Sequence, residues 1–452
     1  MRRIAASLII VCSVVFAPVA ARAAYGDITL VGHRLLPSTS ICDVWGWVDP
    51  MTGREYAIVG SWTTPAALYI VDVTTPAVPV LVSTVNSVPG FDHKVYDHYV
   101  YSCDGNSSGI DSRVVDISNP LAPVILPGAF QSAHNIAVSP TGLLFLEYRG
   151  LTIYDVATDP TAPDSLWRRN TIDGHDSTPK GTRLYDFHGY TDCRIYDIAN
   201  PGSPTLLGTI SGTGINYHHS GDATDDHRFL YINDELSTHP EPDIWVFEIS
   251  NPASPVFVTT IADPLATVHN LYIVGGLAFV SYYNSGFKTL DVRNPGSPVV
   301  ADAYDTNGLS GEGYDGAFGV YPFSPNGLVF VSDWDNGLFV FRVEGYNGPP
   351  TAVREDTPAP ESARLYQNVP NPFNPTTTIR YELDAPGAVR LEVFDVSGRL
   401  VRTLAGGTRG AGPHDATWNG TDDAGRAVAS GVYYYRLTAG ATTTTKRMVL
   451  LK

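Results

Sequence analysis

Short runs of alternating apolar and polar residues fill this chain, and each run ends at a turn rich in Gly, Pro, Asn or Asp. Such alternation predicts half-buried β-strands. One pattern recurs along the chain: a β-branched run, an acidic residue and a turn marked by prolines. It is clearest at residues 69–79, which read Tyr-Ile-Val-Asp-Val-Thr-Thr-Pro-Ala-Val-Pro. Further copies lie at 113–123, 152–160, 194–204, 245–255 and 288–298, with a degraded copy at 339–345.

The acidic residue of this pattern recurs every 39 to 51 residues. It stands at Asp72, Asp116, Asp155, Asp197, Glu248 and Asp291, and Arg342 takes its place in the last copy. A period near 45 residues that is built from strands is typical of propeller blades. We therefore expect an all-β protein with a seven-bladed β-propeller at residues 24–345. Six or eight blades remain alternatives, because the longest intervals leave room for insertions.

Each repeat is expected to contain four strands, which in one copy lie at 133–138, 143–148, 151–156 and around Ser165. The last copy has strands only at 318–322, 328–332 and 338–343, and no outer strand follows it. Residues 27–33 resemble the outer strand expected at 205–210. We expect them to complete the final blade, because a closed ring leaves no radial gap.

The N-terminus has the features of a secretory signal peptide at residues 1–23. Arg2 and Arg3 precede an apolar run at 4–20, and cleavage is expected after Ala23. The run is too short for a comfortable membrane span, and no second stretch approaches membrane length. The mature protein is thus expected to be secreted or on the outer cell surface, with no transmembrane helix.

Loss of the three arginines of the signal would change the formal net charge from −17 to −20. Nucleic acid is therefore not an expected partner, because phosphates are bound by Lys and Arg. Cys42, Cys103 and Cys193 remain after cleavage. Cys42 and Cys103 fall in adjacent expected blades, where either a disulfide or free thiols would be compatible with export.

The C-terminal part is expected to form a separate domain. Residues 346–361 are rich in Pro, Gly and acidic residues and are typical of a linker. Alternating runs at 380–383, 389–394 and 432–437 then predict a small Ig-like β-sandwich at 362–452.

Polar residues line up at the starts of the expected inner strands. The pairs are Cys42-Asp43, Phe91-Asp92, His134-Asn135, His175-Asp176, His218-His219, His269-Asn270 and Tyr314-Asp315. Inner strands surround the axial channel of a propeller, so these residues should form rings near one mouth. Carboxylates suit calcium, and imidazoles shift the preference to zinc, manganese or iron. The candidate ligands of a divalent cation at the channel are Asp43, Asp92, His134, His175, Asp176, His218, His219, His269 and Asp315.

A structural role is the alternative for these residues, because buried polar groups need hydrogen-bond partners and a neighbouring blade can supply them. The repeated acid at Asp72 and its equivalents is expected to cap backbone N–H groups of the turn that follows it.

The repeat with its Pro-x-x-Pro turn resembles the LVIVD-repeat propellers. Residues 25–345 also resemble the "choice-of-anchor B" family through 43–47 (Asp-Val-Trp-Gly-Trp), 55–60 and 268–272. The name of that family implies a surface-displayed propeller joined to varying C-terminal anchors. The resemblance implies no established chemistry.

The C-terminal segment resembles FlgD-like, type IX secretion sorting domains. Its opening, Leu-Tyr-Gln-Asn-Val-Pro-Asn-Pro-Phe-Asn-Pro at 365–375, carries the resemblance, together with 393–401, 418–425, 430–437 and 446–452. The resemblance implies a passenger exported through the general pathway and then carried over the outer membrane by secretion machinery that reads this domain. A plain structural module is the alternative.

The sequence as a whole favours a secreted, surface-displayed propeller that binds or scaffolds an extracellular ligand. Catalysis is not expected, because the repeat shows no asymmetric catalytic cluster and the chain has no phosphate loop or His-Glu-x-x-His. The alternative is a metal-dependent hydrolase or lyase that uses the Asp/His-rich channel mouth.

Overall fold

The computed structural model describes residues 24–62, 66–105, 112–128, 130–148, 150–170, 174–237, 242–263, 266–349, 363–383, 387–395, 398–423, 425–439 and 442–451. The expected signal peptide and most of the expected linker lie outside these ranges. In the described residues all regular structure is β, and no helix there is long and apolar enough to cross a membrane.

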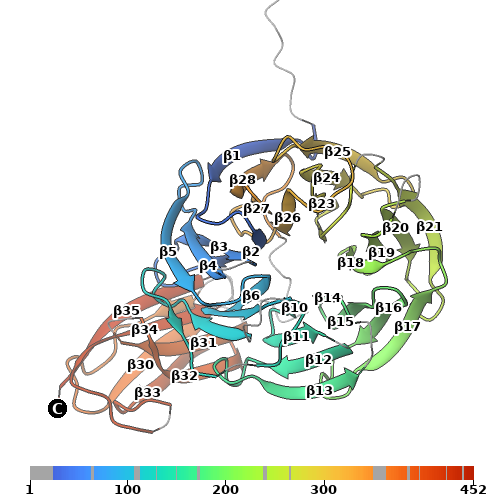
Figure 1. Cartoon of the computed structure of the whole chain (residues 1–452). Helices are drawn as coiled ribbons and strands as arrows, with labels where there is room; N and C mark the ends of the chain where they lie inside the picture. The colour runs from blue at the N-terminus through green and yellow to red at the C-terminus, as the bar shows by residue number, and fades with distance from the viewer. Residues whose placement is uncertain are drawn as a thin grey trace, which may run out of the picture.

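Seven four-stranded antiparallel sheets are arranged around an axis as the blades of a propeller (Figure 1). The expectation of an all-β, seven-bladed propeller is confirmed. From the axis outward, the first four blades consist of β2 (Ile41–Val48), β3 (Glu55–Ser61), β4 (Ala67–Asp72) and β5 (Val80–Asn86) in blade 1; β6 (Asp92–Tyr96), β7 (Tyr99–Cys103), β8 (Arg113–Asp116) and β9 (Val124–Ile125) in blade 2; β10 (Asn135–Val138), β11 (Leu143–Glu147), β12 (Gly150–Asp155) and β13 (Asp164–Asn170) in blade 3; and β14 (Asp176–Lys180), β15 (Arg183–Phe187), β16 (Asp192–Asp197) and β17 (Thr205–Ser211) in blade 4.

The chain closes the ring with its own first strand. The last three blades are β18 (His218–Ala223), β19 (Phe229–Asp234), β20 (Ile244–Glu248) and β21 (Val256–Ile261) in blade 5; β22 (Leu271–Val274), β23 (Leu277–Ser281), β24 (Phe287–Asp291) and β25 (Val299–Tyr304) in blade 6; and β26 (Ala317–Tyr321), β27 (Leu328–Asp333), β28 (Gly337–Val343) and β1 (Ile28–Arg34) in blade 7. β1 pairs antiparallel with β28 from Ile28↔Val343 to Arg34↔Leu338, so the expected closure is confirmed (Figure 1).

Packing between blades explains why the ring is stable. Each pair of neighbouring blades shares its own buried apolar cluster, including the pair formed by blades 7 and 1. In the blade 7–1 cluster, for example, Tyr321 and Phe330 pack with Ile41 and Tyr69. The inner and middle strands supply these clusters, whereas the outermost strands expose apolar residues such as Val80 and Leu206.

The repeated acid has the turn-capping role expected from the sequence. Asp72 accepts the backbone N–H of Thr74 at 2.9 Å, and Asp116 accepts that of Ser118 at 2.8 Å. The equivalent carboxylates of Asp155, Asp197 and Asp291 accept the backbone N–H two residues further on in the same way. These bonds fix the turn that leads from the third strand of a blade to its outer strand.

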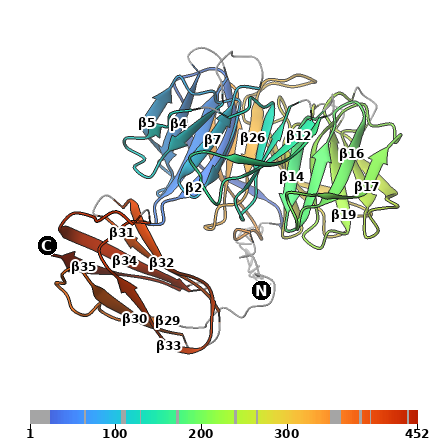
Figure 2. The same ribbon diagram turned by 90° about the horizontal axis from the view of Figure 1, so that it is seen from below.

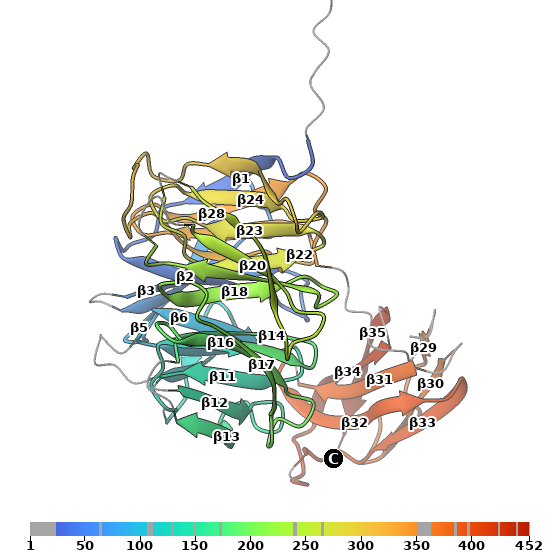
Figure 3. The ribbon, with the colours of Figure 1, turned by 90° about the vertical axis from the view of Figure 1, so that its right-hand side faces the viewer.

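The C-terminal Ig-like sandwich is the second unit (Figures 2 and 3). Its two sheets have the orders β29-β30-β33 and β32-β31-β34-β35. The strands are β29 (Ala363–Leu365), β30 (Thr377–Leu383), β31 (Gly387–Phe394), β32 (Leu400–Arg409), β33 (Gly412–Trp418), β34 (Gly431–Ala439) and β35 (Thr442–Leu450). Every residue of its buried core comes from the C-terminal part, with Trp418 fully buried at the centre.

The sandwich contacts the face of the propeller where the inner strands end. Arg436 Nη1 donates to the carbonyl oxygen of Pro50 at 3.4 Å, and Pro50 follows β2 directly. The starts of the inner strands lie at the opposite face. The candidate site described below, at the starts of the inner strands, therefore lies on the face opposite this contact.

Candidate functional site

Six aromatic rings from consecutive blades surround the axis where the inner strands begin. They form a closed series with neighbouring centroids 4.2–5.7 Å apart, and Cys42 of blade 1 packs beside it. The members, from blade 2 to blade 7, are Phe91, His134, His175, His219, His269 and Phe318. We call this series the mouth ring.

Four of the six members are histidines whose Nδ1 atoms are already engaged. His175 Nδ1–H donates to the carbonyl oxygen of His219 at 2.9 Å, and His269 Nδ1–H donates to that of Phe318 at 2.6 Å. His134 makes a longer contact of 3.4 Å with the carbonyl of Gly105. A carbonyl only accepts, so these bonds place the proton on Nδ1 and leave Nε2 as the atom with a free lone pair.

His219 reaches the same state through a hydroxyl. Ser220 Oγ donates its own proton to the carbonyl of His269 at 2.9 Å, so it accepts the Nδ1–H of His219 at 3.1 Å. These bonds also join blade 4 to blade 5, and blade 5 to blade 6. The same side chains therefore also make hydrogen bonds between blades, which is the structural role given above as the alternative.

The imidazoles of the mouth ring are neutral at neutral pH. Burial disfavours the charged form and lowers the pKa of His134, takes those of His175 and His219 well below their usual value, and lowers that of His269 to about 4. A neutral imidazole with its Nδ1 engaged is the form that binds a metal ion through Nε2.

Glu235 adds a carboxylate to this neighbourhood. It follows the end of β19, and its Oε2 lies 3.5 Å from His219 Nε2. Its Oε1 accepts the hydroxyl of Tyr283 at 2.6 Å. Burial, opposed by the Tyr283 bond and assisted by the nearby Asp234, raises the pKa of Glu235 to about 7. Among the described residues, His175, His219 and Glu235 place one potential ligand atom each within 4.8 Å of the others.

A second polar layer lies further along the inner strands, and here a lysine supplies the positive charge. Lys94 is buried, and its ammonium bonds to Asp43 at 2.7 Å and also to Asp92. Asp92 Oδ2 in turn accepts the backbone N–H of Ile136 at 2.7 Å, so the group ties blades 1, 2 and 3 together. Lys94 already bonds to both carboxyl groups, so the arrangement does not favour Asp43 and Asp92 as metal ligands, and that role stays a prediction.

The charges in this layer are unequal. Burial raises the pKa of Asp43 well above its usual value. Burial also disfavours charge on Asp92, but Lys94 together with the hydrogen bonds from Asp43 and the backbone of Ile136 outweighs it and lowers the pKa of Asp92 to about 2. Burial and the charge of Asp92 raise the pKa of Asp176 to about 8. Asp176 therefore belongs with this carboxylate and lysine layer.

Two other expected ligands lie outside the mouth ring. His218 Nδ1–H bonds to the carbonyl of Gly189 at 3.0 Å, one residue before the ring member His219. Asp315 is exposed, and Phe318 takes the place expected for Tyr314. In blade 7 the ring member lies inside β26, four residues after Tyr314. In blade 5, β18 contains a bulge at its start, between His218 and Gly221. An extra residue there changes which side chain faces the axis.

Sequence reasoning missed the residues contributed by the loops after the second strands. Glu235 and Tyr283 belong to the site, and Trp62 and Trp334 pack beside it in a half-buried aromatic cluster. The signal that would have found most of them is their position directly after the second strand of a blade, because that end lies at the same face as the start of the inner strand.

Of the two alternatives left open by the sequence, a Cys42–Cys103 disulfide or free thiols, the structure has free thiols. Cys42, Cys103 and Cys193 are all free and buried, and the Cys103 thiol contacts the carbonyl oxygen of His134 at 3.4 Å. Burial raises the pKa of all three thiols well above the usual value, so they behave as small apolar side chains.

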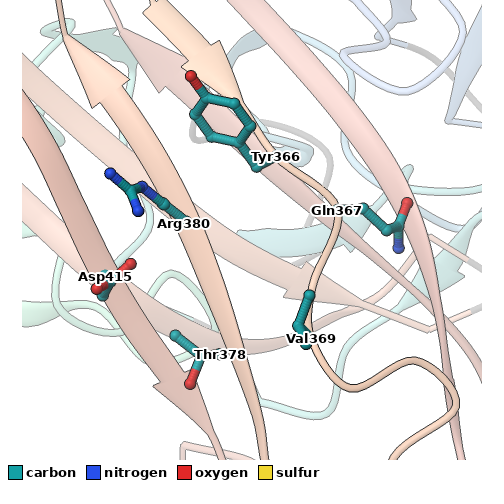
Figure 4. A pocket seen from close by; sticks show the side chains of 6 residues that line it. All are labelled: Tyr366, Gln367, Val369, Thr378, Arg380 and Asp415. Atoms are coloured by element: carbon teal, nitrogen blue, oxygen red, sulfur yellow. The ribbon is translucent and has the colours of Figure 1, made fainter.

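A further hollow lies on the Ig-like domain, beside β30 (Figure 4). Tyr366, Gln367 and Val369 border it on one side and Thr378, Arg380 and Asp415 on the other. Arg380 and Asp415 face each other across β30 and β33, which pairs opposite charges on the sheet surface. This arrangement serves the sheet and carries no catalytic set of residues.

The fold thus defines a seven-bladed β-propeller followed by an Ig-like domain, and comparison with known families agrees. The LVIVD repeat matches residues 55–87, 92–127 and 267–306, which lie in blades 1, 2 and 6. The FlgD Ig-like domain matches residues 373–443. The chain contains LVIVD repeats and a FlgD Ig-like domain, as the sequence patterns indicated.

One similar solved structure is that of PorZ, described as an essential bacterial surface component of the type IX secretion system of Porphyromonas gingivalis. The two share 14% sequence identity with a TM-score of 0.45, over 89% of this chain and 58% of PorZ. The chain therefore spans less than two thirds of that structure. No curated protein sequence matches this chain significantly.

Proposed function

We propose that this protein is exported and displayed outside the cell, where the propeller acts as a binding or scaffold module. The FlgD-like domain directs its export or surface attachment by engaging secretion machinery. The observation that carries this proposal is that the chain folds as two units with separate cores. The propeller is closed by its own first strand, and the Ig-like domain has a core made only of its own residues.

The segment at 365–375 supports a role of the C-terminal domain in recognition by secretion machinery, because its residues pack against and pair with β35. Phe373 is buried against Trp418 and pairs with Leu450. Asn371 Oδ1 accepts the backbone N–H of Val449 at 2.8 Å. A receptor that reads this domain would therefore meet the opening segment and the last strand as one surface.

Deleting residues 362–452 tests the role of the domain. Because the deletion removes none of the propeller cores, the truncated chain should keep its β-rich circular dichroism and tryptophan fluorescence while losing delivery to the surface. Normal delivery of the folded, truncated chain would contradict the proposal. Loss of folding would contradict the separation of the two units.

The mouth of the propeller supports the binding role, because it lies on the face opposite the contact with the Ig-like domain. Tyr190 and Tyr314 are mostly exposed near the mouth ring, through contacts with Tyr217 and Tyr283. Aromatic side chains with an exposed edge are common in binding surfaces. A non-enzymatic module should give only background turnover with panels of esters, phosphates and glycosides.

A metal-dependent hydrolase or lyase is the second candidate, and the placement of Glu235 beside His175 and His219 favours it. In such an enzyme the metal ion would polarise the substrate or activate water. The same panels, repeated with added zinc, manganese or calcium, separate the candidates. Turnover that requires metal and disappears when His134, His175 and His269 are replaced would support the enzyme and overturn the binding module.

A further inference from the structure

We infer that His175, His219 and Glu235 form a binding site for a divalent transition-metal ion, with the two histidines ligating through Nε2 and the glutamate through one carboxylate oxygen. The inference concerns binding alone. It holds for either candidate function.

The donor atoms have a suitable chemistry and spacing. Two imidazoles with one carboxylate are typical ligands of zinc, iron and manganese, whereas calcium prefers an all-oxygen set. Bond lengths of about 2.0–2.1 Å around a tetrahedral ion put neighbouring donor atoms roughly 3.3 Å apart. The 3.5 Å between His219 Nε2 and Glu235 Oε2 is close to that value, and all three donors lie within 4.8 Å of one another.

The surrounding bonds hold each donor in a ligating state. The Nδ1–H groups of His175 and His219 are engaged by the His219 carbonyl and by Ser220 Oγ. Asn233 donates to the same hydroxyl at 3.1 Å, and Tyr283 holds the other oxygen of Glu235. Such second contacts fix the ring orientation and the tautomer of metal-binding histidines.

One feature of the site is not used by the hydrogen bonds between blades. The hydrogen bonds between blades use Nδ1, and they do not require a carboxylate beside the Nε2 of a neutral imidazole. Glu235 contacts the hydroxyl of Tyr283 and the imidazole of His219, and neither of these groups is a permanent cation. In the Asp43–Asp92 layer a lysine fills that role. At Glu235 a bound metal ion would supply the positive charge.

The ligand atoms of three residues converge, and two further histidines of the mouth ring are not among them. His134 and His269 flank the two ligating histidines, with ring centroids 4.6 and 4.8 Å away. Three protein ligands leave the fourth position of a tetrahedral ion open for water or an exogenous ligand, as in sites that bind a further molecule.

The test uses the full chain, purified without a polyhistidine tag, stripped with a chelator and titrated with zinc chloride by calorimetry. We expect one ion per chain and a rise in the unfolding temperature, because binding to the folded state alone stabilises it. Replacement of zinc by cobalt should give the visible absorption of a four-coordinate ion. Absence of saturable binding, or several ions per chain without a cobalt spectrum, would overturn the inference.

Two matched variants locate the site. Glu235→Gln keeps the size of the side chain and an acceptor for Tyr283 but removes the anionic ligand, so zinc affinity should fall at least tenfold. His218→Gln changes the adjacent histidine that bonds to Gly189, and its zinc affinity should stay within twofold of the wild type. Equal zinc affinities of the two variants would overturn the inference, and their unfolding temperatures without metal show that both remain folded. Export of the protein is unaffected by either outcome.

Discussion

The buried Lys94 is the most informative single position for the stability of the ring. Its side chain is only 5% exposed, and its ammonium bonds to Asp43 and Asp92, which are 8% and 9% exposed. Replacing Lys94 with Met preserves most of the volume but leaves two carboxylates facing each other without a cation. Removing one partner of a buried ion pair costs about 3–5 kcal/mol, because the remaining charge is buried and uncompensated.

The cost of Lys94→Met should depend on pH in a defined direction. Burial already raises the pKa of Asp43, and loss of the lysine raises it further. An acid whose folded pKa exceeds its unfolded value destabilises the protein above the unfolded pKa, and this penalty disappears as the pH falls. The variant should therefore lose more stability at pH 8 than at pH 5. Adding Asp43→Asn to Lys94→Met should restore a large part of the loss.

Denaturant unfolding followed by tryptophan fluorescence is the suitable assay, because Trp418 belongs to the Ig-like core while the other six tryptophans lie in the propeller. Arg54→Met is the control, since this arginine pairs with Asp72 from an exposed position and its loss should change stability far less. A loss below about 1 kcal/mol for Lys94→Met, or no relief from Asp43→Asn, would refute the view that Lys94 compensates two buried carboxylates.

Three further predictions concern closure, acid sensitivity and close packing. Deleting residues 24–34 removes β1 and exposes the edge of β28, so limited proteolysis should cleave blade 7 first; uniform resistance would count against closure by β1. His93 is buried with its Nε2–H on the carbonyl of Ile58 and no hydrogen-bond partner at Nδ1 among the described residues, and burial lowers its pKa to about 4. Because the unfolded chain binds this proton near pH 6.5, stability should fall by up to about 3 kcal/mol between pH 6.5 and 4, and His93→Gln should flatten that slope in urea titrations. A Cβ on Gly319 would lie 2.6 Å from Asp43 Oδ1 and 2.8 Å from the backbone nitrogen of Val44, so Gly319→Ala should lower the unfolding temperature; an unchanged temperature would mean that the inner strands can separate freely.

The architecture was predictable because it depends on a repeated local signal. Each turn with an acidic residue after a third strand marks one blade, as Asp72 does for blade 1. Six such copies and one degraded copy correspond to the seven sheets of the propeller. The closing strand was predictable from the absence of an outer strand after Arg342. These features follow from alternation and turn chemistry, which act over a few residues.

The candidate site was predictable only in part, because it depends on bulges and on loops. His134, His175 and His269 start regular inner strands and were placed correctly in the mouth ring, while the bulge in β18 exchanged His218 for His219. Glu235 comes from a loop of a different strand, and no periodicity marks it. Lys94 faces the two carboxylates from β6, and only the three-dimensional packing shows that it neutralises them.

The most direct test of the proposed function is the location of the propeller in cells that make the full chain. Intact cells can be probed with an antibody raised against residues 24–345, and compared with permeabilised cells and with the culture medium. The proposal predicts staining of intact cells or recovery of the protein from the medium. Staining that requires permeabilisation, with no protein in the medium, would contradict it.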